Sequence, residues 1–64
     1  NLTIPEDLEI AFEQNQLAYI NYSNFSPSYR KSYLYWLNQA KREETRLNRI
    51  REIIALCHQN KKSR

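Results

Sequence analysis

The segment SPSYRKSYLYWLNQA, residues 26–40, carries the clearest structural signal in this sequence. Serine is preferred just before a helix, and proline suits the first helical position because its missing N–H needs no partner there. Ser26 and Pro27 therefore predict a helix from residue 27 to about residue 41. On a helical wheel, a sector of about 100° contains Tyr29, Tyr33, Trp36, Leu37 and Ala40. Such a stripe is typical of a helix that faces a core, so we expect these side chains to be buried.

Two helices are expected before this one. Pro5 is followed by acidic residues, and both features suit a helix N-terminus, which predicts a first helix over residues 5–14. Asn15 is expected to end that helix. Residues 16–22 then form a short second helix, with Leu17 and Ile20 facing inward.

A fourth helix is expected to begin at Glu43 or Glu44 and to run to about residue 59, closed by Asn60. Its apolar face consists of Leu47, Ile50, Ile53, Ile54 and Cys57. Arg46 projects into the edge of that face, where an unpaired charge would be costly. We therefore predict that Arg46 pairs with an acidic residue of the first helix, namely Asp7, Glu9 or Glu13.

Composition supports an all-α fold. The 64 residues contain no glycine and only two prolines, and residues that favour helices dominate. We predict a small bundle of four helices, the second short, with residues 1–60 as a single helical domain and residues 61–64 as a frayed basic tail. Because the sequence lacks an initiator methionine and a signal-peptide pattern, we expect it to be a piece of a longer protein; the resemblance described below implies that this piece is a C-terminal module.

Location can also be inferred from the sequence. No run approaches the roughly 20 apolar residues of a membrane span. A single cysteine suits a reducing compartment. The expected location is therefore the cytoplasm.

Charge is distributed unevenly along the chain. Residues 1–25 carry Glu6, Asp7, Glu9 and Glu13 and no base, whereas residues 26–64 carry ten bases and three acids, within a total of +3. One interpretation is that acidic and basic helices neutralise each other where they pack. The other is that a basic face binds an anionic partner.

The best candidate for a recognition face lies opposite the predicted core stripe. Tyr35 falls there together with Lys31, Asn38 and Arg42, which combines an aromatic plane, an amide and two cations. We predict that these four residues form a binding face. The alternative is an exposed tyrosine among charges with no role.

No catalytic or metal-binding constellation is apparent in the sequence. Cys57 and His58 are neighbours, so on a helix they point about 100° apart, and no second cluster of metal ligands exists. Cys57 is expected to be a small buried hydrophobic residue. We predict a chain that is not an enzyme and that binds no metal and no cofactor.

Nucleic-acid binding is the alternative function. The third and fourth helices could form a helix-turn-helix, with arginines near phosphates at positions Arg42, Arg46, Arg49 and Arg51. Against this, Glu43 and Glu44 would lie at the tip of the recognition helix, where they would repel phosphate.

Residues 26–50, SPSYRKSYLYWLNQAKREETRLNRI, resemble the C-terminal helical module of the bacteriocin-protection family, also called YdeI or OmpD-associated. The matching positions are Ser26, Pro27, Arg30, Lys31, Tyr33, Trp36, Ala40, Lys41, Glu44, Thr45, Arg46, Arg49 and Ile50. The upstream IPEDLEIAFEQN is also similar, through Pro5, Asp7 and Leu8. Two positions depart from the family pattern: Glu43 stands where proline is frequent, and Asn60 where glycine is common.

The resemblance implies a bacterial module with a role in protection against bacteriocins or antimicrobial peptides. It implies no activity, cofactor or catalytic residue. A domain of +3 would repel cationic peptides, so protection is expected to act through a protein partner or through the module's own upstream domain. A further possibility is that the segment only stabilises that neighbouring domain.

Overall fold

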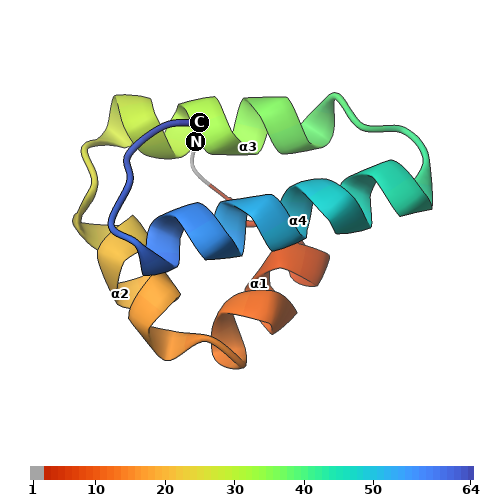
Figure 1. The fold of residues 1–64 in the computed structure, drawn as a ribbon. Coiled ribbons are helices and arrows are strands. Elements are labelled where there is room, and N and C mark those ends of the chain that lie inside the picture. The colour runs from red at the N-terminus through yellow and green to blue at the C-terminus, as the bar shows by residue number, and fades with distance from the viewer. Residues whose placement is uncertain (1–2) are drawn as a thin grey trace.

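The computed structural model describes residues 3–64 as four α-helices with no strand among them, which confirms the predicted all-α bundle. The helices are α1 (Glu6–Glu13), α2 (Gln16–Asn24), α3 (Pro27–Asn38) and α4 (Glu43–His58). In Figure 1, α3 and α4 lie side by side, and α1 and α2 lie on the other side of α4. The chain after α4 turns back toward α3 (Figure 1).

The helix boundaries differ from the predicted ones mainly at two ends. α2 continues to Asn24 rather than to residue 22, and α3 ends at Asn38 rather than at about residue 41. α3 stops early because Ala40 turns inward and is buried, while Arg42 takes up an extended conformation before α4. The backbone N–H of Gln39 still donates to the carbonyl of Tyr35, which closes the last turn of α3.

The core confirms only part of the predicted stripe on α3. Tyr33 and Leu37 are almost fully buried. The prediction for Tyr29 is wrong, because 41% of this residue is exposed, and Trp36 is only partly buried. Leu34, which the stripe omitted, is buried instead. The side of α3 that meets the core is therefore rotated toward Leu34, and Tyr29 and Trp36 lie at its edge.

The prediction for the inner face of α2 is wrong. Leu17 and Ile20 were expected to face inward, yet they are 51% and 54% exposed. Ala18 and Tyr22 are buried in their place, and the Tyr22 ring packs 5.0 Å from that of Phe12. A small alanine at the contact lets two helices approach closely, so α2 turns its smallest side chain, rather than its leucine and isoleucine, toward the core.

A single polar contact fixes the rotation of α2 on α4. The side-chain Nδ2 of Asn21 donates to the carbonyl of Cys57 at 2.8 Å. The Cys57 carbonyl is one of the last four of α4, which have no partner within the helix, and it accepts this bond together with one from the N–H of Asn60. On α4, Ile50, Ile53 and Cys57 are buried as predicted, whereas Leu47 is 47% exposed and does not belong to the core.

Asn60 closes α4 as predicted. Its φ of 61° is left-handed, a conformation that asparagine tolerates better than most residues. Its N–H donates to the carbonyl of Cys57, and the N–H of Lys61 donates to that of Leu56, which is the hydrogen-bond pattern of a Schellman motif. Asparagine can therefore replace the glycine that is common at this position.

Candidate functional site

The four predicted recognition residues all lie on the surface around α3. Tyr35 is the most exposed large hydrophobic residue of the described chain, at 71%. Lys31 precedes it by one helical turn and Asn38 follows it by nearly one turn, so the three share one side of α3. Arg42 lies beyond the end of α3, immediately before α4. We call this set the Tyr35 face: Lys31, Tyr35, Asn38 and Arg42.

Arg46 holds one end of the Tyr35 face in place. As predicted from the sequence, its guanidinium pairs with Asp7, through Nε–Oδ2 and Nη2–Oδ1 distances of 2.9 and 3.0 Å. Its Nη1 also donates to the Leu37 carbonyl at 3.5 Å and to the Asn38 Oδ1 at 3.4 Å. The Arg46 hydrogen bond lowers the pKa of Asp7 below its usual value. One arginine thus joins α1 and α4 to the C-terminal end of α3.

The Arg46 contacts also change the chemistry of the Tyr35 face. The amide oxygen of Asn38 is engaged within the domain, so this residue offers a partner mainly its N–H donors. Lys31, Tyr35 and Arg42 have no aromatic, cation–π or ion-pair contact within residues 3–64. These three side chains are therefore free to meet a partner.

A second arginine of α4, Arg49, makes its contacts within the domain, and these contacts were not predicted from the sequence. Arg49 donates from Nη1 to the carbonyl of Trp36 at 2.7 Å, and its guanidinium lies 4.9 Å from the indole centroid. The guanidinium of Arg64 lies 4.3 Å from the same indole. Trp36 thus packs against the edge of the core on one side and is covered by two cations elsewhere.

The residues after α4 lie along the same edge of α3. The hydroxyl of Tyr33 donates to the carbonyl of Lys61 at 2.8 Å, and the ammonium of Lys62 lies 5.7 Å from the ring of Tyr29. The partly exposed aromatic residues of α3 are therefore covered by basic side chains of the C-terminal segment. The signal in the sequence was the combination of a third helix rich in aromatic residues with a cluster of cations after the fourth helix.

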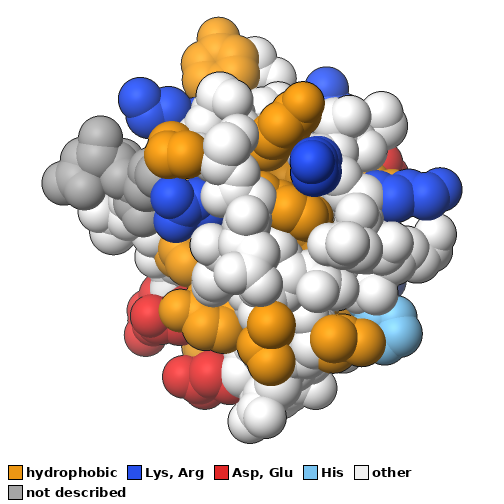
Figure 2. Space-filling view, turned by 90° about the vertical axis from the view of Figure 1, so that its left-hand side faces the viewer, with side chains coloured by type: hydrophobic (Ala, Val, Ile, Leu, Met, Phe, Trp, Pro, Cys, Tyr) orange, Lys and Arg blue, Asp and Glu red, His pale blue; other side chains and the backbone are white. Residues whose placement is uncertain are grey.

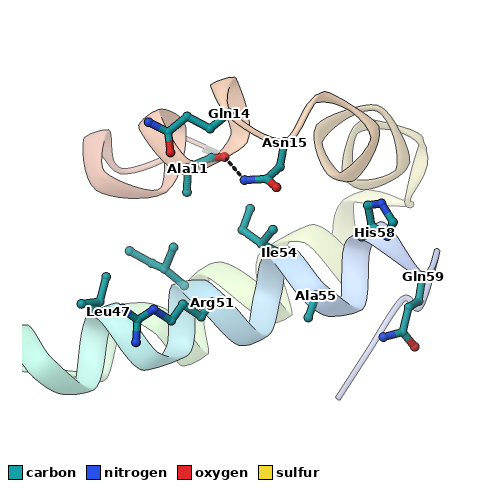
Figure 3. A pocket seen from close by; sticks show the side chains of 10 residues that line it. Ala11, Gln14, Asn15, Leu47, Arg51, Ile54, Ala55, His58 and Gln59 are labelled. Carbon is teal, nitrogen blue, oxygen red and sulfur yellow. Dashed lines mark hydrogen bonds between the residues drawn. The ribbon is translucent and has the colours of Figure 1, made fainter.

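Two hollows lie on either side of α1. The first, with a volume of about 520 Å³, runs between α1 and α4. Figure 3 shows Ala11 and Asn15 on one side of it and Ile54 on the other, with Leu47, Arg51 and His58 further along α4. Asn15 is held by a bond from its Nδ2 to the Ala11 carbonyl at 2.8 Å. The lining of this groove combines aliphatic side chains, such as Ile50 and Ile54, with polar ones, such as Arg51 and His58.

The second hollow lies between α1 and α2 and has a volume of about 380 Å³. Its lining includes Phe12, Tyr19 and Ile20 together with two glutamates, Glu9 and Glu13. Sequence reasoning missed this hollow because it placed Ile20 in the core.

Cys57 and His58 are neighbours on α4 and differ in exposure. Cys57 is fully buried, as predicted, and burial raises the pKa of its thiol to about 12. His58 is exposed on the neighbouring position of α4. No three His, Cys, Asp or Glu side chains within residues 3–64 lie close enough to hold a metal ion. None of the helices described is long and apolar enough to cross a membrane.

Comparison with known proteins identifies the family of this chain. No curated protein and no solved structure matches the sequence. The family described as Bacteriocin-protection, YdeI or OmpD-Associated matches residues 1–60. This match includes all four helices, the Asp7–Arg46 pair and the Tyr35 face. The chain therefore belongs to the bacteriocin-protection, YdeI or OmpD-associated family.

Proposed function

We propose that this chain is a non-enzymatic protein-interaction or regulatory module of the bacteriocin-protection type, and that its Tyr35 face contacts a partner protein. The observation that carries the proposal is the 71% exposure of Tyr35 between Lys31 and Arg42. The other aromatic residues of α3 all have contacts within the domain, whether in the core or with basic side chains. Tyrosine and arginine are also enriched among residues that dominate binding energy.

The proposed setting is the cytoplasm, where a free thiol such as that of Cys57 persists. The proposed partner is a protein, either a separate chain or an upstream domain of the same protein. If the module only stabilised a neighbouring domain, its removal would lower the melting temperature of that protein and change nothing else.

The test combines Tyr35→Ala with Arg42→Glu and measures capture of the native partner. Both residues are exposed, so the circular dichroism spectrum and the unfolding midpoint should be unchanged. Binding should fall by more than about tenfold, because large losses concentrate at a few aromatic and arginine positions. Arg51→Glu is the matched control, since Arg51 is exposed and its replacement changes the net charge as Arg42→Glu does. Unchanged capture by the double variant would count against the Tyr35 face.

Nucleic-acid binding through the basic half is the second candidate. Its four arginines are not equally available, because Arg46 pairs with Asp7 and Arg49 contacts Trp36. Only Arg42 and Arg51 of that set are exposed. The alternative predicts affinity for DNA or RNA that falls steeply with salt. No shift of DNA or RNA in a gel at low salt would dismiss it.

A further inference from the structure

The hollow between α1 and α2 combines an aromatic floor with an acidic rim. Phe12 is 2% exposed and forms the floor, and the ring of Tyr19 lies 5.5 Å from it. We call this hollow the acidic cleft; its lining includes Ile4, Glu9, Phe12, Glu13, Tyr19 and Ile20. Its volume of about 380 Å³ lies at the lower end of ligand-binding pockets. It has room for a few side chains rather than for a large cofactor.

The stability of the fold accounts for only one of the two glutamates of the cleft, because Glu9 lies in the first turn of α1, where the helix dipole favours a negative charge. Glu9 and Glu13 are four residues apart on α1, and like charges at this spacing repel each other. Glu13 is also the last residue of α1, where the helix dipole disfavours a negative charge. Neither residue has an ion-pair partner in the described part of the chain. Their charges are therefore available to a molecule outside the domain.

The apolar side chains at the mouth of the cleft are also not used by the fold. Tyr19 is 46% exposed and Ile20 54% exposed, while α2 packs on the core through Ala18 and Tyr22. Figure 2 views the α2 end of the molecule and shows a band of hydrophobic side chains across its lower half, with acidic side chains at its left. Adjacent exposed apolar side chains with a polar rim are typical of an interaction site.

We propose that the acidic cleft binds a basic, amphipathic helical segment of a partner protein. Apolar side chains of that segment would pack on Phe12, Tyr19 and Ile20, and its Lys or Arg side chains would pair with Glu9 and Glu13. Charge complementarity identifies this occupant, because the lining of the cleft contains Glu9 and Glu13 and no Lys or Arg. The repulsion expected from a net charge of +3 applies to the domain as a whole, whereas the lining of the cleft carries only these two negative charges, and salt screens charges beyond about 8–10 Å.

A second copy of this chain is a weaker candidate for the occupant. The acidic cleft would have to meet the basic half of another copy, which is a head-to-tail contact between two different surfaces. Contacts of this kind build rings or open filaments rather than a closed dimer. The proposed occupant of the acidic cleft is therefore a different protein, and the test below includes self-association as one of its outcomes.

The test titrates the 64-residue chain with a fluorescent synthetic peptide and measures anisotropy. The peptide is a helix of about 14 residues, or four turns, with leucine along one face and lysine elsewhere. Ile20→Ser should raise Kd by about tenfold, because a buried isoleucine contributes about one such factor or more. Ile10→Ser is the matched control: Ile10 is 49% exposed but lies outside the cleft, so Kd should change by less than about twofold. Replacing Glu9 and Glu13 together by Gln should weaken binding and reduce its salt dependence.

Three outcomes would overturn the proposal. The first is equal binding of a peptide with glutamate in place of lysine. The second is an equal loss of affinity for Ile20→Ser and Ile10→Ser, or no saturable binding of the lysine-containing peptide at all. The third is sedimentation that shows self-association abolished by Ile20→Ser, which would make a second copy the occupant. None of these results affects the Tyr35 face, because the two surfaces share no residue.

Discussion

Replacing Arg46 by alanine should lower the free energy of unfolding by about 1.5 kcal/mol. Arg46 joins Asp7 of α1 to the carbonyl of Leu37 and the side chain of Asn38 at the end of α3. The substitution removes a bidentate ion pair, two longer hydrogen bonds and the packing of the arginine stem. A domain of 64 residues is expected to be stable by only about 3–10 kcal/mol, so the loss should be easy to measure.

The size of the expected destabilisation follows from the exposure of the Arg46 and Asp7 side chains. The Arg46 side chain is 24% exposed and that of Asp7 45%, so water screens their attraction. Exposed pairs contribute about 0.2–1 kcal/mol, and the bidentate geometry puts this pair near the upper limit. The bonds to Leu37 and Asn38 measure 3.5 and 3.4 Å, so together they add about 0.5 kcal/mol. These two contributions account for nearly all of the expected loss, and the lost packing of the arginine stem adds only a little.

The assay is a double-mutant cycle in urea with Arg46→Ala, Asp7→Asn and both together. The coupling energy isolates the pair and should be about 0.5–1 kcal/mol, falling as salt is added. Arg46→Lys should recover less than half of it, because an ammonium does not form the bidentate contact. Additive single losses, or a coupling energy that salt leaves unchanged, would refute the argument.

The same pair predicts a dependence of stability on acid. The pKa of Asp7 in the folded chain is lowered, chiefly by the hydrogen bond from Arg46. Folding therefore favours the carboxylate, and this contribution is present above the unfolded pKa, near 3.8. It is lost as the pH falls through the lower, folded value. Asp7→Asn should remove this part of the acid dependence, and an identical acid profile in the variant would contradict the assignment.

Three further predictions concern the core and the end of α4. Asn60→Gly should stabilise the chain by about 0.5 kcal/mol and Asn60→Ala should destabilise it by about 1 kcal/mol, measured by thermal unfolding, because the φ of 61° penalises a Cβ. Tyr33→Phe should cost about 0.5–1.5 kcal/mol in urea, because it removes the bond to the Lys61 carbonyl; no change would mean that water replaces it. Stability should fall between about pH 9 and pH 12, because burial raises the pKa of Tyr22, Tyr33 and Cys57 to about 12, so the folded state holds protons that the unfolded state releases. A flat profile over this range would contradict the burial of these groups.

The features predicted correctly from the sequence depend either on residue preferences within one helical turn or on the high energetic cost of an unpaired charge. Ser26 and Pro27 marked the start of α3 because N-terminal preferences act within one helical turn. The Arg46–Asp7 pair was predictable because an arginine at the edge of an apolar face needs a carboxylate, and the first helix offered few choices. In both cases the deciding residues could be read without knowledge of the packing.

The rotation of α2 could not be predicted in this way. Its sequence QLAYINYSN places apolar side chains on every side, so helical periodicity gives no preferred direction. The direction is set by Asn21, whose partner Cys57 lies 36 residues later. The sequence-based prediction placed Leu17 and Ile20 in the core because they are large hydrophobic residues. In the structure, the smaller Ala18 is buried there instead. For this reason the acidic cleft is visible only in the structure.

The burial of Tyr29 and Trp36, at the edge of α3, was overestimated from the sequence for a related reason. A stripe on a helical wheel shows which side chains group together, and it does not show which neighbour covers each of them. Trp36 belongs to the stripe, yet its ring is covered by Arg49 and Arg64. Lysine and arginine side chains can cover an aromatic ring while their charged ends remain in water. Tyr29, next to Lys62, follows the same pattern.

The uneven charge of the chain is not explained by neutralisation between its own helices. Within residues 3–64 one ion pair links the acidic and basic halves, between Asp7 and Arg46. Of the four acidic residues in positions 1–25, Glu6, Glu9 and Glu13 remain without a basic partner. The Tyr35 face carries two cations, Lys31 and Arg42, whereas the acidic cleft carries two carboxylates of α1, Glu9 and Glu13. Under the two proposals above, these surfaces of opposite charge bind two different partners. A typical contact covers about 800 Å² per partner, and the domain exposes 4581 Å², so both partners could bind at once.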